Sequence, residues 1–256
     1  MNEASSLTHE ADNYRQTAWE PAAKMLKEER SMRSVTKIVV KGAVDVVFFR
    51  ESSSQLVVAS DEQSLIKNVI TRFEGSKLVI EQEGVSISGG GRSINVSGNG
   101  NIIAGGNIYI SGGRGKQTMR FPGSVGDFAI DQGRCLIGIT LPEAPLIRVK
   151  SSGNVTLYDL DQPVLDVSVQ GSGDITAFGR VELLDAEVAG SGDVDASELV
   201  SRAAKLSVAG SGDIDAFVTD NVKARVAGSG DIVVRGSPST RDHNVFGSGD
   251  IKFKKK

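Results

Sequence analysis

Apolar and polar residues alternate along short segments of the C-terminal half of the chain, and these segments recur at a fixed interval. The recurring element is Gly-Ser-Gly-Asp followed by Ile or Val. It begins at Gly171, Gly190, Gly210, Gly228 and Gly247, with spacings of 19, 20, 18 and 19 residues. A degenerate copy, residues 152–155, stands one period upstream. Self-similarity at this interval is typical of one supersecondary unit stacked on copies of itself.

Aligning the copies on the repeated Asp predicts which side chains point inward, because strand side chains alternate between two faces. Five positions before the Asp stands a valine column: Val149, Val169, Val188, Val208, Val226 and Val245. One position after it the residues are Val155, Ile175, Val194, Ile214, Ile232 and Ile251. The positions between are mostly polar, so each copy predicts two short amphipathic strands joined at Gly-Ser-Gly. Equal chemistry in successive copies favours parallel stacking. The sequence therefore predicts an all-β fold, a single-stranded parallel β-helix or β-solenoid with repeats of about 19 residues.

The Gly-Ser-Gly corner has a structural and a functional interpretation. Glycine tolerates positive φ at a sharp bend, and Ser or Asp side chains satisfy amide groups freed by a turn. The repeated carboxylates are also candidate metal ligands: Asp174, Asp193, Asp213, Asp231 and Asp250. Calcium-binding β-rolls, however, use Gly-Gly-x-Gly-x-Asp at a period of about nine residues. The spacing favours the structural role, so no metal site is predicted, although Asp195 and Asp215 add a second carboxylate in two copies.

The N-terminal part differs from the repeats. Residues 1–34 form an extension in which residues 13–33 are rich in helix-forming residues, with Trp19, Ala22 and Leu26 on an apolar stripe. This pattern predicts a short N-terminal helix that either caps the solenoid or docks on a partner. Residues 35–256 are predicted to form one solenoid domain, in which residues 35–83 supply the first, less regular rungs and a short helical or turn segment lies near residues 62–69.

A Gly/Ser/Asn-rich insertion at about residues 84–117 interrupts this domain, and residues 118–150 return to regular strands. Phosphate-binding glycine loops need a strand before and a helix after them, a context that is missing here. No cofactor is predicted. The insertion is interpreted as a pair of β-hairpins or arches, or as low-complexity sequence. Binding commonly resides in such excursions. The candidate partner-binding residues are Trp19, Leu26, Ile94, Val96, Ile108, Tyr109 and Ile110.

Composition narrows the function classes. The 29 basic and 32 acidic residues nearly cancel, so no overall field recruits nucleic acid. The terminal lysines, Lys252 and residues 254–256, are interpreted as protection of an exposed sheet edge. Cys135 is the single cysteine, which predicts a buried structural thiol and no intrachain disulfide. The first 16 residues lack a basic and an apolar region of the kind found in signal peptides, and no run approaches membrane-spanning length. The sequence as given predicts no membrane insertion and a cytoplasmic location.

An enzyme is not predicted. Only His9 and His243 are available for a Ser-His-Asp site, and His243 falls in an inward column of the last repeat. Asp193 and Asp195 are a candidate carboxylate pair for glycan hydrolysis, but Asp residues two apart are expected on any solvent-facing strand. No catalytic residue is therefore assigned.

Several segments carry a family resemblance: VTKIVVKGAVDVVFF, QLVVASDEQSLIKNVITRFEGSKLVIEQE, ITLPEAPLIRVKSSGNV and the serial turns ending in VFGSGDIKFK. Over residues 35–83 and 118–254 the chain resembles the bacterial DUF2807 family, whose domain is called the head GIN domain of autotransporter adhesins. The resemblance implies a right-handed parallel β-helical fold that is commonly associated with the cell envelope, which is the alternative location. It implies no catalytic motif.

We therefore predict a non-enzymatic structural or binding module that presents a β-solenoid surface to a protein or glycan partner, with a homo-oligomer possible. One alternative is a subunit of a larger assembly that docks through its N-terminal helix. Another is a carboxylate-dependent enzyme acting on glycans.

Overall fold

A computed structural model describes residues 20–82 and 135–255 of the chain, and of residues 83–134 it describes the strands β7 to β12 as backbone. The helical elements are η1 (Glu20–Lys24) and α2 (Gln63–Asn68). The strands are β1 (Leu26–Arg30), β2 (Lys37–Lys41), β3 (Asp45–Arg50), β4 (Gln55–Ser60), β5 (Val69–Glu74), β6 (Lys77–Gln82), β7 (Val85–Gly89), β8 (Arg92–Val96), β9 (Ile102–Ile103), β10 (Tyr109–Ser111), β11 (Lys116–Arg120), β12 (Phe128–Asp131), β13 (Cys135–Leu141), β14 (Leu146–Val149), β15 (Val155–Val169), β16 (Ile175–Val188), β17 (Val194–Val208), β18 (Ile214–Val226), β19 (Ile232–Gly236), β20 (Thr240–Val245) and β21 (Ile251–Lys254).

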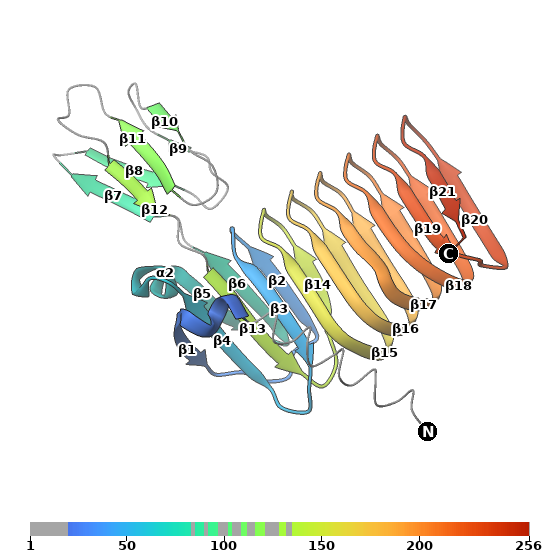
Figure 1. The fold of residues 1–256 in the computed structure, drawn as a ribbon, viewed down its shortest axis with the longest axis horizontal. Coiled ribbons are helices and arrows are strands. Elements are labelled where there is room, and N and C mark those ends of the chain that lie inside the picture. The colour runs from blue at the N-terminus through green and yellow to red at the C-terminus, as the bar shows by residue number, and fades with distance from the viewer. Residues whose placement is uncertain are drawn as a thin grey trace.

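The repeats form a β-solenoid of about five turns, as predicted. Each of the long strands β15 to β18 bends around one turn and pairs in parallel with the next turn (Figure 1). The register follows the repeat, since Val169 pairs with Val188, Val188 with Val208 and Val208 with Val226. β19 and β20 together make the next turn, and β21 adds a short strand at the end.

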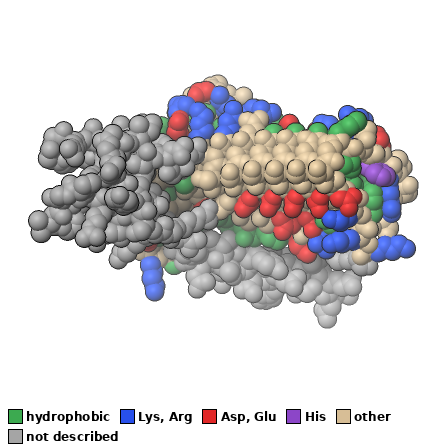
Figure 2. All heavy atoms as spheres, turned by 90° about the horizontal axis from the view of Figure 1, so that it is seen from above, with side chains coloured by type: hydrophobic (Ala, Val, Ile, Leu, Met, Phe, Trp, Pro, Cys, Tyr) green, Lys and Arg blue, Asp and Glu red, His purple; other side chains and the backbone are tan. Residues whose placement is uncertain are grey.

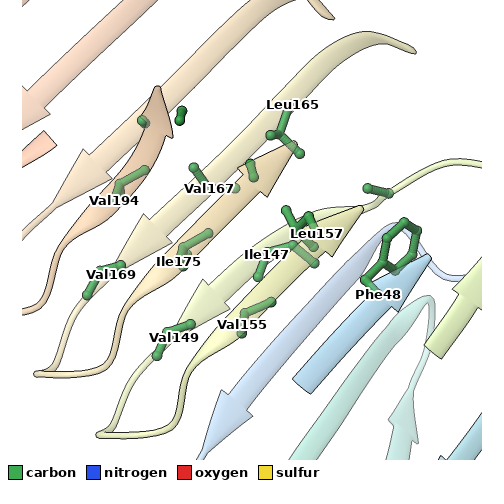
Figure 3. Packing of buried hydrophobic residues seen from close by; sticks show 14 of the residues in the cluster. Phe48, Ile147, Val149, Val155, Leu157, Leu165, Val167, Val169, Ile175 and Val194 are labelled. Carbon is green, nitrogen blue, oxygen red and sulfur yellow. The ribbon is translucent and has the colours of Figure 1, made fainter. Parts of the chain in front are cut away.

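The core of the solenoid consists of the columns predicted from the repeat. The valines at 149, 169, 188, 208 and 226 are at most 1% exposed, and only Val245 of the last turn, at 36%, is not buried. Figure 3 shows Val149, Val155, Val167 and Val169 lying between the two arms of successive turns. Burial of such an aliphatic side chain stabilises the fold by about 1.5 to 3 kcal/mol. Each turn contributes only a few, so neighbouring turns are needed for stability.

The glycines of the corners are required by stacking, and the predicted positive φ is wrong for all of them except Gly247. A Cβ atom on Gly192 would lie 2.0 Å from the carbonyl oxygen of Gly173 in the turn before it. The same holds for Gly212 against Gly192, also at 2.0 Å. Backbone bonds hold the corners together, for example from the Ser191 amide to the Gly171 carbonyl at 2.9 Å. The corners therefore stack backbone on backbone, leaving no room for a side chain between turns.

The N-terminal end of the main sheet is closed by antiparallel strands. β2, β3, β6, β13 and β14 continue the parallel stack, whereas β4 pairs antiparallel with β13, β1 with β4, and β5 with β6. The predicted irregularity of residues 35–83 arises from these reversals, and the predicted helical segment is α2. Arg30 joins the two edges, because its guanidinium donates to the carbonyl oxygens of Val69 at 2.6 Å and Ile66 at 2.8 Å.

The predicted N-terminal helix is wrong over its second half. Residues 20–24 form one 3-10 turn, and Leu26 to Arg30 form β1, whose partners run from Ser60 to Leu56 of β4. A short isolated helix gains little in water, whereas the free edge of β4 offers a full ladder of backbone hydrogen bonds. Ala22 of the 3-10 turn is buried with Val47 and Phe49, so this segment belongs to the fold. The expected helical residues 13–19 lie outside the described part of the chain.

The strands between β6 and β13 pair among themselves. β7, β8 and β9 form one antiparallel sheet, and β10, β11 and β12 form another. The strands expected at residues 118–131 therefore pair with β10, and the main sheet resumes at β13.

Side chains cover the C-terminal end of the solenoid. In the last turn Arg241 and His243 occupy the positions that Val222 and Ala224 hold in the turn before, and all six residues of β20 are exposed. The Arg241 guanidinium lies 4.5 Å from the centre of the Phe253 ring, and the His243 ring meets the same ring edge-on at 5.3 Å. Polar groups at inward positions indicate an end adapted to water rather than to another turn.

Replacing Gly212 with Ala is expected to destabilise the protein by about 3 kcal/mol, because the corners must separate to admit a methyl group. Ser211→Ala, one residue away at an exposed position, is the control and should change stability by less than about 0.5 kcal/mol. Urea unfolding followed by circular dichroism measures both. Equal stability of the two variants would show that the corners do not limit the stacking.

Removing the polar cover of the last turn is expected to cause association through the end of the solenoid. A variant with Arg241→Val, His243→Leu and Lys254→Val presents an apolar, uncharged edge strand, which pairs readily with another copy. Light scattering coupled to size-exclusion chromatography should show dimers or larger species. The control carries Lys205→Val, Lys223→Leu and Arg225→Val on the side of the solenoid and should stay monomeric. A monomeric end variant, or equal association of the control, would contradict the expectation.

Candidate functional site

The corners form a straight ridge along the outside of the solenoid. Figure 2 shows this ridge as a tan band of glycine and serine, with a row of acidic side chains beside it. The serines of the ridge are exposed: Ser172, Ser191, Ser211, Ser229 and Ser248. Because neighbouring turns are about 4.8 Å apart, the ridge repeats polar groups at that interval.

The repeated Asp residues form a hydrogen-bonded ladder beside the ridge. The side chain of each one accepts a bond from the backbone amide of its counterpart in the next turn. The series runs from Asn154 Oδ1, which accepts from the Asp174 amide at 3.1 Å, through Asp174 at 2.9 Å, Asp193 at 2.7 Å and Asp213 at 2.7 Å, to Asp231, which accepts from the Asp250 amide at 2.8 Å. The carboxylates thus satisfy amide groups that the corner leaves without a sheet partner.

Other charges on this side are also engaged. Lys252 donates to Asp231 at 2.7 Å and, more than the Asp250 amide, lowers the pKa of Asp231. Arg235 forms two bonds to Asp215, at 2.7 and 2.6 Å. No group of three or more His, Cys, Asp or Glu side chains that could hold a metal ion occurs in the part of the chain that the structure describes. The absence of a metal site stays a prediction.

The candidate catalytic residues are not assembled into an acid and base pair by any printed contact. Asp193 accepts the Asp213 amide, and Asp195 accepts from the amide and hydroxyl of Ser197 at 3.0 and 2.7 Å. His243 lies against Phe253 on the last turn. His9 lies outside the described residues.

The candidate partner-binding residues fall on separate elements. Leu26 lies in β1 and is 48% exposed. Ile94 and Val96 lie in β8, and Tyr109 and Ile110 in β10, where the structure describes the backbone alone. Trp19 and Ile108 are outside the described residues. Their role in binding stays a prediction.

An aromatic stack on the outer face escaped the sequence analysis. Phe49, Tyr158 and Phe178 stack in succession, with ring centres 5.3 and 5.0 Å apart and ring planes 17° and 8° from parallel. Tyr158 and Phe178 stand four positions after the Asn and Asp of the corner, so the repeat alignment contains the signal. Because the ring faces are directed at one another, they are used within the fold.

An exposed apolar strip on a third side of the solenoid was also missed. We define it as Val164, Leu183 and Val200, which are 49%, 38% and 40% exposed and lie on three successive turns. Val164 pairs directly with Leu183. Arg202 borders the strip and bonds to Glu182 at 3.4 Å and Asp220 at 2.9 Å. The turns differ in length on this side, where the register shifts between Ala196 and Val200, so alignment on the corner does not reveal the strip.

Comparison with known protein families gives a match over residues 34–238 to the model of DUF2807, described as "Putative auto-transporter adhesin, head GIN domain". The chain belongs to this family. No curated protein matches the chain. In the described part of this GIN domain, every helix is too short or too polar to cross a membrane.

Solved structures with similar folds bear related names. A structure from Bacteroides fragilis named a putative adhesin is 17% identical, with a TM-score of 0.59 and coverage of 91% of this chain and 98% of that one. A structure from Parabacteroides distasonis named a putative lipid binding protein is 18% identical, with a TM-score of 0.45 and coverage of 91% and 97%. At these identities the first of them supports the fold of the GIN domain.

The ladder needs an acceptor oxygen, not a charge, because Asn154 starts it with an amide. Asp213→Asn is therefore expected to leave the thermal unfolding midpoint nearly unchanged, whereas Asp213→Ala should lower it by about 3 °C. Differential scanning calorimetry at neutral pH distinguishes the two. A midpoint that falls equally in both variants would mean that the negative charge itself matters.

Proposed function

We propose that this GIN domain is a non-enzymatic binding module of the cell envelope that holds a protein partner against the side of the solenoid. Membership of a family described as adhesins supports a binding role. The observation that carries the proposal is the exposed apolar strip of Val164, Leu183 and Val200. Side chains of this kind, in register on successive turns and bordered by ion pairs, are typical of interaction surfaces.

The described surface favours a protein over a glycan. Binding to sugar rings commonly uses the free face of an aromatic ring. In the stack of Phe49, Tyr158 and Phe178, the rings direct their faces at one another. The strip is aliphatic, so it matches apolar side chains of a protein.

The two alternative functions have less support. Asp193 and Asp195, the candidate pair for glycan hydrolysis, both accept hydrogen bonds within the fold. Docking through an N-terminal helix conflicts with the pairing of residues 26–30 with β4. Residues 84–133 remain a second candidate contact surface, since β7 to β12 pair among themselves.

Binding to a panel of purified extracellular proteins, measured by biolayer interferometry, tests the proposal. We expect at least one partner whose affinity falls tenfold or more in a Leu183→Lys, Val200→Lys variant. The control, Glu187→Lys with Ser207→Lys, places the same side chains on another face and should bind normally.

A variant in which a Gly-Ser linker replaces residues 84–133 separates the two surfaces. Retained binding supports the strip, and lost binding with a normal melting curve moves the contact to residues 84–133. A domain that binds no protein of the panel but binds a glycan array would overturn the choice of partner.

A further inference from the structure

Two cross-strand neighbours on an outer face of the sheet carry buried polar atoms without a hydrogen-bond partner. They are Nε of Arg148 in β14 and Oγ of Ser168 in β15, and among the described side chains no other buried polar atom lacks a partner. Arg148 and Ser168 pair directly, and Ser168 is only 1% exposed. Leaving such groups unpaired costs about 1 to 3 kcal/mol each, so an unpaired pair on adjacent strands points to a missing partner.

Unpaired positive charges surround these two residues. Lys37 lies on the neighbouring strand β2, and Lys150 directly follows β14. Burial lowers the pKa of Lys37, and the positive charges of Arg148, Lys77 and Lys150 lower it further. None of the ion pairs between described residues includes Lys37, Arg148 or Lys150. The three cations thus repel one another with no bound carboxylate to offset the repulsion.

Two carboxylates border the group on the side of the later turns. Glu187 is the partner of Ser168 in β16, and Asp166 lies two residues before Ser168. Asp166 acts on Lys37 through its charge, but it forms no ion pair with a described residue. Burial, followed by the charge of Asp185, raises the pKa of Asp166. A negative ligand would therefore bind toward β2 and β14, away from these two residues.

We propose that Arg148, Ser168, Lys37 and Lys150 form a binding site for a tetrahedral oxyanion, the phosphate or sulfate group of a ligand. The four side chains supply N–H and O–H donors, and every oxygen of such a group is an acceptor. The planar guanidinium of Arg148 matches two of those oxygens at once. Rotation of the Arg148 side chain uncovers the Ser168 hydroxyl beneath it. The anion relieves the repulsion among the cations and gives both buried atoms a partner.

This site is independent of the apolar strip proposed for protein binding, because it uses other residues and a different ligand chemistry. Neither proposal fails with the other.

Isothermal titration calorimetry with inorganic phosphate and with sulfate, at pH 7 and constant ionic strength, tests the site. We expect one site with a dissociation constant in the millimolar range or tighter, weakened at least tenfold by Arg148→Gln and severalfold by Ser168→Ala. Arg225→Gln is the matched control. Arg225 lies in the same row of cross-strand partners, on β18, has no ion pair among the described residues, and should not affect binding.

Circular dichroism checks that Arg148→Gln is folded. If it is not, a Lys37→Gln, Lys150→Gln variant replaces it, with the same tenfold loss expected. Glycerol phosphate and vesicles of phosphatidylcholine with phosphatidic acid then identify whether a soluble or a lipid-borne phosphate binds better. Heat signals no larger than those of sodium chloride at equal ionic strength, or equal binding by the wild type and a folded Arg148→Gln variant, would overturn the proposal.

Discussion

The contact of backbone with backbone at the corners is the constraint on which the solenoid depends. A carbonyl oxygen of one turn lies where a Cβ atom of the next would be, so both outer positions of Gly-Ser-Gly must be glycine. Because the corners are in direct contact, equivalent residues of successive turns are held in register. The valine column and the Asp ladder follow from that register. Cross-strand order in the arms is therefore determined at the corner.

This dependence explains why the repeats could be predicted from the sequence and the ends could not. Stacking places residues such as Val188 and Val208 in the same environment, so one alignment predicts all the core columns. The strand β1 depends on a partner thirty residues away, Ser60 to Leu56, and no local pattern in residues 26–30 records it. The corner glycines were predicted at the right positions for the wrong reason, since inter-turn contact leaves no trace in the composition of a single turn.

The candidate sites divide in the same way. The acidic column was visible as a pattern, but its use as a ladder of acceptors depends on distances between turns. The apolar strip lies where the turns differ in length, so the repeat conceals it. Arg148 and Ser168 belong to different turns and come together only through parallel pairing of β14 with β15. Regular positions therefore serve the fold, and the surfaces proposed for binding occupy positions where the repeat varies.

The direction of the Asp ladder has a consequence for how such a domain changes its length. Every turn accepts an amide from the turn after it and donates its own to the turn before, so a duplicated turn of 18 to 20 residues is satisfied on both sides. The first acceptor, Asn154, and the covering residues Arg241 and His243 remain where they are. Internal duplication would extend the solenoid by about 4.8 Å each time while leaving both ends unaltered. Length is thus a property that recombination can vary without designing new ends.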